Sequence, residues 1–216
     1  MAIAFDFTLE QEELRSLTKE FAQREIVPIA AEIDEKDEFP WGLWKKMAKP
    51  PYRYAGMAIH GEYGGAPRSI LDTCIITEEL SATSESAISV ALIEGATLAA
   101  TALVTGGSEE QKRRYLPPIA QGEGMSCFAL TEPGAGSDAA AIQTKAELKD
   151  NQYVISGRKR YASFASISNF LVVFAKTSPV KGARGISAFV VEKGTPGFSI
   201  VEKIPCLGMR DTRMKK

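Results

Sequence analysis

Cysteine and histidine are scarce in this sequence, and their scarcity argues against two classes of site. The 216 residues include three cysteines, Cys74, Cys127 and Cys206, and one histidine, His60. An odd cysteine count without a C-x-x-C pair argues against a disulfide framework, and the sulfur and imidazole ligands are too few and too scattered for a zinc site. We therefore expect no metal, three cysteines packed as small buried hydrophobes, and a solvated His60 in a glycine-rich loop.

Net charge and long apolar runs are also lacking. The chain has 26 basic and 27 acidic residues and a formal charge of −1, so its overall charge favours neither nucleic acid nor an anionic membrane as a partner. No run approaches the ~18 consecutive apolar residues that span a bilayer. Met1 to Phe7 lacks the basic or Arg-rich pattern of a targeting peptide. We expect no membrane span, and a cytoplasmic protein or a trimmed mature one.

The period of the apolar residues is helical up to about residue 121. Residues 8–11 and 108–111 have the pattern of capping boxes, in which a hydroxyl and an amide side chain satisfy the free N–H groups of a first turn. Pro28 predicts a break, and a short helix is expected between Pro40 and Pro50. This half, residues 1–121, is predicted to be an all-α domain.

Two further helices are expected between residues 69 and 103. Ser69 is placed to cap a helix that runs through about Ala82. Its predicted inward face consists of Ile70, Thr73, Cys74, Thr77 and Leu80. The helix over 86–103 is apolar or small around nearly its whole circumference, except at Glu94, which predicts burial on most sides.

The second half, residues 122–216, has the alternation typical of short strands. The predicted strands are 126–131, 144–149, 152–156, 170–176, 186–192 and 198–203. Asp150-Asn151 predicts a tight hairpin turn, because both residues tolerate a positive φ. Helices followed by strands indicate an α+β fold with two domains. The basic stretch 210–216 is interpreted either as a frayed tail or as a chain cut inside its β domain.

A glycine-rich loop follows the first predicted strand. Residues 134–139 match the G-x-G-x-x-A dinucleotide-binding pattern, but a strand follows where that fold requires a helix, and no acidic residue stands ~20 positions later. A Rossmann fold is therefore rejected. The two glycines still allow close approach of a ligand, and backbone N–H groups with the Thr131 and Ser137 hydroxyls could hold an anion. An ordinary tight loop is the alternative.

Residues 128–138, which read FALTEPGAGSD, are very similar to a signature of the acyl-CoA dehydrogenase family. Segments 64–65, 108–116, 174–177 and 195–197 agree with that family in position, so the resemblance covers nearly the whole chain. It implies an all-α N-terminal domain followed by an antiparallel β-barrel-like domain, with the family's C-terminal helical bundle absent. It also implies FAD as cofactor, an acyl-CoA substrate, electron-transferring flavoprotein as acceptor, and a homotetramer when the protein is complete.

The resemblance assigns site residues by position. Phe128, Leu130 and Thr131 would line the pyrimidine side of the flavin, and Gly136 with Ser137 would meet the FAD pyrophosphate or the CoA. Family members usually carry an aromatic residue followed by Ile-Thr-Asn-Gly, and the matching residues here are 161–165. Tyr161 keeps an aromatic plane and Ser163 keeps a hydroxyl near flavin N5, while Phe164-Ala165 replaces the Asn-Gly turn.

Glu94 has two interpretations. An isolated carboxylate on an apolar helix needs a partner, solvent or a proton. Its place eighteen residues before Lys112 resembles that of medium-chain members, in which a glutamate marks the base of the acyl pocket. Glu94 would then bind substrate by limiting acyl length or by pairing with a polar ω-group. The alternative is a helix-edge carboxylate that reaches water.

The resemblance leaves the catalytic base unassigned. In the family this carboxylate belongs to the C-terminal helical domain, and no residue here takes that role. Residues 49–54 also depart from the Leu-Gly-rich stretch of relatives. The function expected is FAD-dependent α,β-dehydrogenation of an acyl-CoA to a trans-2-enoyl-CoA. A non-catalytic acyl-CoA or flavin-binding module, a structural reuse of the fold, and a monooxygenase or oxidase on the same scaffold stay open.

Overall fold

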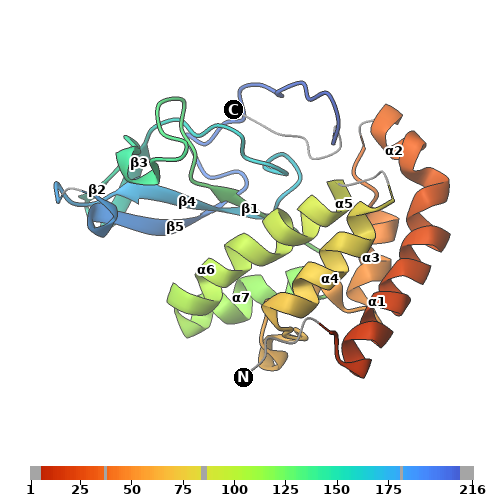
Figure 1. Cartoon of the computed structure of the whole chain (residues 1–216). Helices are drawn as coiled ribbons and strands as arrows, with labels where there is room; N and C mark the ends of the chain where they lie inside the picture. Colours follow the sequence, from red (N-terminus) through yellow and green to blue (C-terminus); the bar gives the residue numbers. More distant parts are fainter. Residues whose placement is uncertain (1–5, 37, 84–86, 181, 210–216) are drawn as a thin grey trace.

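The computed structural model describes residues 6–36, 38–83, 87–180 and 182–209, and it places the helices on one side and the sheet on the other (Figure 1). The predicted tail 210–216 lies outside the described residues. The helices are α1 Leu9–Phe21, α2 Ala30–Lys36, α3 Trp41–Ala48, α4 Ile70–Ser81, α5 Ala87–Val90, α6 Ala99–Gly106 and α7 Glu109–Ala120. The strands are β1 Ser126–Ala129, β2 Lys145–Lys149, β3 Gln152–Ser156, β4 Phe170–Lys176 and β5 Ile186–Glu192.

The predicted helix boundaries follow the capping and proline signals. Thr8 and Ser108 each form the predicted capping box, at α1 and α7. Pro28 lies in a 3-10 turn, Val27–Ile29, which follows a π-helical turn, Ala22–Ile26, and separates α1 from α2. α3 begins directly after Pro40 and ends before Pro50. Hydrogen bonding by a polar cap therefore marks the start of α1 and α7, whereas proline marks the start of α3.

Helix α4 has the predicted cap, but of the five residues predicted to face inward only Leu80 is fully buried. Ser69 caps it in a third capping box, whereas Ile70 is 85% exposed and Cys74 is also exposed. The buried residues are Ile75, Ile76, Glu79 and Leu80. The prediction was wrong because the ion pair between Arg15 of α1 and Glu79, 2.7 Å long, turns a charged position of α4 inward. Of the three cysteines, only Cys127 is fully buried.

The long apolar helix runs continuously from α5 into α6 through a π-helical segment, Ala91–Leu98. By length and composition alone, Ile88–Gly106 qualifies as a candidate membrane span, and half of its most apolar window is buried inside the protein. The segment qualifies by its mean hydropathy and not by an unbroken apolar run, because Ser89, Glu94 and Thr97 interrupt it. Because Ile88, Leu92, Ala96 and Leu103 are all buried, the structure uses this helix as a core element.

The sheet is centred on β4. β1 runs parallel to β4 along one edge, with Ser126 opposite Phe170, and β2 continues that edge through a single pair, Lys145 with Lys176. β5 pairs antiparallel with β4 along the other edge. The β2–β3 hairpin turns at Asp150 and Asn151, whose φ values of 48° and 63° match the prediction.

The antiparallel barrel expected for residues 122–216 is not formed, because the sheet is open and mixed. β1 and β2 both pair parallel to β4, and β3 and β5 are left as separate edges. The predicted strand 198–203 is also absent within the described residues. Phe198 and Ile200 pack instead against the buried cluster around Leu171 and Val173. The alternation of Phe198 and Ile200 therefore reflects one covered face of the segment rather than a strand.

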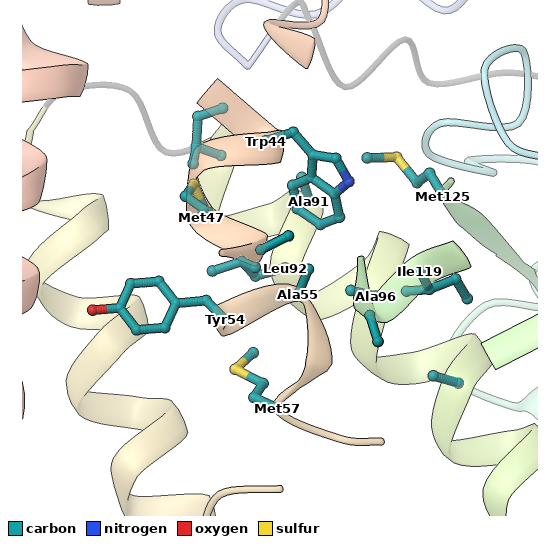
Figure 2. Close-up of a cluster of buried hydrophobic side chains, with 14 of the residues drawn as sticks. Trp44, Met47, Tyr54, Ala55, Met57, Ala91, Leu92, Ala96, Ile119 and Met125 are labelled. Carbon is teal, nitrogen blue, oxygen red and sulfur yellow. The ribbon is translucent and has the colours of Figure 1, made fainter. Parts of the chain in front are cut away.

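The main core joins the helices to the sheet. Figure 2 shows Trp44 of α3, Leu92 of the π-helical segment and Met125, which precedes β1, in one apolar cluster. The same cluster includes Phe164, Phe170 and Val172 from the strand half. The Trp44 indole donates to the carbonyl of Gly124, 3.3 Å away, just before β1. The start of β1, and with it the loop that follows, is thereby fixed against the helices.

Candidate functional site

The loop that leaves β1 is closed by backbone hydrogen bonds. The Glu132 N–H donates to the Ala135 carbonyl at 3.0 Å, and the Ala135 N–H donates back to the Glu132 carbonyl at 3.2 Å. This tight turn buries Ala135 and leaves Gly134, Gly136 and Ser137 exposed. The fold therefore presents the predicted anion-facing residues at the end of a strand.

A second segment, residues 159–166, lies directly against this loop. The Arg160 N–H donates to the Thr131 carbonyl at 2.8 Å. Ala162 and Ala165 pack against Cys127 and Ala129 of β1. Tyr161 and Phe164 both have a positive φ, of 58° and 61°, which sharply bends the chain on each side of Ser163. Segments 128–132 and 159–166, far apart in sequence, thus form one surface.

A buried ion pair joins the same two segments. Lys159 Nζ donates to Glu132 Oε1 at 2.8 Å and to the Leu130 carbonyl at 2.9 Å. The Lys159 and Glu132 side chains are only 12% and 6% exposed. Glu132 also accepts from the backbone N–H groups of Gln143 and Thr144.

These contacts set the charges of the pair. Burial by itself raises the pKa of Glu132, but the hydrogen bond from Lys159 and those from the two N–H groups outweigh it and lower that pKa to about 2. Burial lowers the pKa of Lys159 from its ordinary value, against the opposing effect of Glu132. The carboxylate therefore stays ionised through the neutral range.

Unsatisfied polar atoms gather in this segment. Arg160 Nε, Ser163 Oγ and Ser166 Oγ are buried and have no hydrogen-bond partner. The Arg160 guanidinium carbon lies 4.8 Å from the centroid of the Tyr161 ring. Since a buried polar group without a partner is costly, three within seven residues indicate a surface that is completed by a polar ligand. This donor set suits a flavin, whose ring carries polar edges and whose phosphates are anionic.

The structure brings together most of the predicted cofactor residues. Leu130 and Thr131 are half-buried beside Tyr161, which is 49% exposed, and Ser163 is buried. Phe128 is half-buried, with its ring 4.8 Å from that of Phe174. Gly136 and Ser137 are instead in the exposed part of the loop. The structure therefore offers an aromatic and hydroxyl surface at 128–131 and 161–163, with two small residues beyond it.

Glu94 lies on the π-helical segment that packs against β1. Ser126 Oγ donates to the Gly95 carbonyl at 2.7 Å, and a Cβ added at Gly95 would lie 2.9 Å from the Met125 side chain. Burial, and secondarily the Glu94 charge, raise the pKa of the Cys127 thiol. Glu94 is half-buried, and it lies near enough to Cys127 of β1 for its charge to act on that thiol.

Two half-open hollows lie away from these segments. One of about 260 Å³ lies between the N-termini of α1 and α4, and one of about 170 Å³ lies beside Tyr115 and Phe170. Neither is lined by residues of segments 128–132 or 159–166. Within the part of the chain that the structure describes, no group of three or more His, Cys, Asp or Glu side chains is arranged to hold a metal ion.

Sequence reasoning missed Glu132, Lys159, Arg160 and Ser166 as members of this surface. Glu132 was inside the recognised motif but received no role. The available signal was the basic run 158–160, which stands directly before the predicted flavin residue Tyr161. A lysine between two arginines is usually solvated, so only the fold reveals that Lys159 is buried.

Two family models match the chain. Residues 8–123 match the acyl-CoA dehydrogenase N-terminal domain, and residues 127–216 match the acyl-CoA dehydrogenase middle domain. The short-chain specific acyl-CoA dehydrogenase of Clostridium acetobutylicum is 43% identical over 206 residues, covering 95% of this chain and 54% of the relative. The acryloyl-CoA reductase (NADH) of Anaerotignum propionicum is 42% identical, covering 91% and 49%. The chain therefore spans about half the length of the curated relatives it matches.

Solved structures share the fold. Butyryl-CoA dehydrogenase from Megasphaera elsdenii has a TM-score of 0.86 at 28% identity, covering 99% of this chain and 56% of that one. A chain from a structure of the electron transferring flavoprotein of Acidaminococcus fermentans has a TM-score of 0.88 at 34% identity, covering 99% and 55%. An acyl-CoA dehydrogenase from Bacillus anthracis, solved in complex with FAD, has a TM-score of 0.83 at 29% identity, covering 97% and 35%.

Proposed function

The chain belongs to the acyl-CoA dehydrogenase family, and from that premise we propose that residues 128–137 and 159–166 form the flavin-facing surface of an enzyme that dehydrogenates an acyl-CoA thioester to a trans-2-enoyl-CoA. The observation that carries the proposal is the joining of these two segments, together with three buried atoms of the second segment, Arg160 Nε, Ser163 Oγ and Ser166 Oγ, that have no hydrogen-bond partner. The FAD-bound relative supports the choice of cofactor.

Each residue has a task in this proposal. Bound FAD would supply the acceptor for the substrate's β-hydride. Phe128, Leu130 and Tyr161 present apolar and aromatic faces, while the Thr131 and Ser163 hydroxyls donate to the polar edge of the ring, where negative charge gathers on reduction. Gly136 and Ser137 leave room for an anionic group, either the pyrophosphate of FAD or the CoA. The α-proton base is not assigned to any described residue.

The acyl chain of the substrate is proposed to lie beside the π-helical segment, near β1. Glu94, which is half-buried and acts on the Cys127 thiol through its charge, would then meet the acyl chain. The similarity to a short-chain specific enzyme supports a role in limiting acyl length. Pairing with a polar ω-group is the alternative role for the same carboxylate.

The remaining parts of the proposal concern the whole protein. The family and the flavoprotein-related neighbour support electron-transferring flavoprotein as the electron acceptor. Four predictions from sequence complete the proposal: a homotetramer, a helical domain over 1–121, a β domain over 122–216 and a cytoplasmic location. A binding module that holds flavin or acyl-CoA without turnover is the competing function, since no base is assigned.

Titration of the chain with FAD tests the cofactor surface. We expect flavin absorbance to stay with the wild-type protein. For T131V we expect a several-fold larger dissociation constant for FAD, because the substitution keeps the shape of the side chain and removes one hydrogen-bond donor. T177V is the matched control, since Thr177 is exposed just after β4 and its hydroxyl bonds to that of Ser187, away from the two flavin-facing segments. Equal effects of the two substitutions would contradict the assignment of Thr131.

Anaerobic addition of butyryl-CoA or octanoyl-CoA then separates the two functions. Bleaching of the bound flavin supports dehydrogenation, and it requires a base among residues of this polypeptide. Bound flavin that does not bleach supports the binding module. No flavin binding at any FAD concentration would overturn the proposed surface.

A further inference from the structure

Glu132 and Lys159 form the most buried ion pair among those found in the described part of the chain. Both are fixed by more than each other. Lys159 also holds the Leu130 carbonyl, and Glu132 also holds the N–H groups of Gln143 and Thr144. The pair therefore ties three separate stretches of chain at one point: the loop after β1, the start of β2 and the segment that leads to Tyr161.

We propose that the Glu132–Lys159 pair is a positioning device that couples the two flavin-facing segments, so that neither holds its ligand-ready shape without the other. This inference rests on the proposed function. Neither side chain is assigned a contact with flavin. They act through Leu130, Thr131 and Arg160, whose main chains they align.

The hydrogen bonds next to the pair support a coupling role over simple stabilisation. The Arg160 N–H donates to the Thr131 carbonyl at 2.8 Å, one residue away from each member of the pair. On one side this fixes the residues that lead to the Ala135 turn, and on the other it fixes the bend at Tyr161. A shift of Lys159 would move the Thr131 and Ser163 hydroxyls relative to each other, which is the geometry that the proposed surface requires.

Apolar packing alone would have been an easier way to join these segments. Buried ion pairs lose solvation and are often no more stabilising than well-packed apolar residues, whereas removal of one partner leaves an unpaired buried charge. Charged groups with several fixed partners instead fix the orientation of the segments they join, because each hydrogen bond tolerates only a narrow range of distance and angle. The pair therefore fits a role in orientation better than one in stability.

The test compares E132Q, K159M and the double variant E132Q/K159M. Each single variant is expected to lose stability in urea unfolding, because one buried charge remains unpaired. The double variant removes both charges and is expected to recover most of that stability. Its amide hydrogen-exchange rates should nevertheless rise in both segments, 130–137 and 159–166, while β4 stays protected. Its dissociation constant for FAD should increase by about tenfold.

E79Q is the matched control, because it breaks the Arg15–Glu79 pair of the helical half, in which Glu79 is also buried. It is expected to lower stability and to leave exchange in both segments and FAD affinity unchanged. If the double variant recovers wild-type amide exchange and wild-type FAD affinity together with its stability, the pair is merely structural and the inference is overturned. The same holds if exchange rises in one segment only.

Amide exchange also keeps this inference separate from the proposed function. A wild-type chain that binds no FAD overturns the flavin surface, but the coupled exchange of the two segments is still measured. Conversely, FAD binding that is equal in wild type and double variant overturns the coupling and leaves the flavin surface standing.

Discussion

Phe164 occupies a backbone conformation that large side chains rarely adopt. Its φ is 61°, and its side chain is fully buried, with the ring 5.7 Å from that of Phe39 in the helical half. In the family pattern an asparagine precedes glycine here, and both of those residues tolerate a positive φ. In this chain, burial of an aromatic ring against the helices offsets the backbone cost of the turn.

Substitution of Phe164 separates the two effects. F164A is expected to destabilise the chain by about 3 kcal/mol, because it removes a buried ring. F164G removes the same ring but also the Cβ, so it should be more stable than F164A by up to about 1 kcal/mol. In an ordinary helix or strand the order is reversed. Urea unfolding of the two variants decides the matter, and a glycine variant less stable than the alanine variant would show that the turn is unstrained.

At the scale of single residues, the sequence indicates which side chains suit a cofactor, but it does not reveal which buried side chains pair with one another. Thr131, Tyr161 and Ser163 could be named because their types fit a flavin and their positions match a family motif. Lys159 could not, since a lysine in a basic run is solvated unless a buried carboxylate faces it, and Glu132 is 27 residues away along the chain. Long-range pairing depends on how the loops meet, which no local pattern encodes.

Among the elements, the loop 52–68 carries a contact that only glycine permits. Gly65 lies in the turn that returns to His60, and a Cβ at this position would lie 1.9 Å from the Ile59 carbonyl oxygen. A side chain here must displace backbone that is itself buried, because Ile59 is fully covered. A Cβ added at Gly61, four residues earlier, would have no atom within 4 Å.

These two glycines give a matched pair of variants. G65A is expected to lower the free energy of unfolding by more than about 2 kcal/mol, because buried backbone has to move. G61A is expected to change it by less than about 0.5 kcal/mol, as is usual for exposed loop positions. Thermal or urea unfolding of both variants is the measurement. Similar values for the two would show that the Gly65 turn relaxes freely.

Elements with strong local signals were predictable, and their packing was not. The capping boxes at Thr8, Ser69 and Ser108 begin their helices as expected, because a cap is formed within four residues. The buried face of α4 was misassigned because Glu79 turns inward to Arg15. The open, mixed sheet was missed because strand order and direction depend on contacts such as Ser126 with Phe170, which alternation cannot specify.

Across the whole molecule, one core links the two halves. Trp44 and Met47 of α3 belong to the same buried cluster as Phe170 and Val172 of β4. Phe170 also meets Tyr115 of α7, with ring centroids 4.8 Å apart. A cluster that spans both halves favours unfolding as one cooperative unit, even though the sequence divides the chain near residue 122.

Both tryptophans of the chain, Trp41 and Trp44, lie in α3, so their fluorescence reports mainly on the helical half and on the contact of Trp44 with Gly124. F170A, made in the sheet, is expected to cost about 3 kcal/mol and to shift the urea midpoint of tryptophan fluorescence together with the loss of exchange protection in β4. V154A, in the exposed part of β3, serves as the control and should leave both nearly unchanged. A fluorescence midpoint that stays in place while β4 loses protection would mean that the two halves unfold separately, and that the core across them contributes packing without cooperativity.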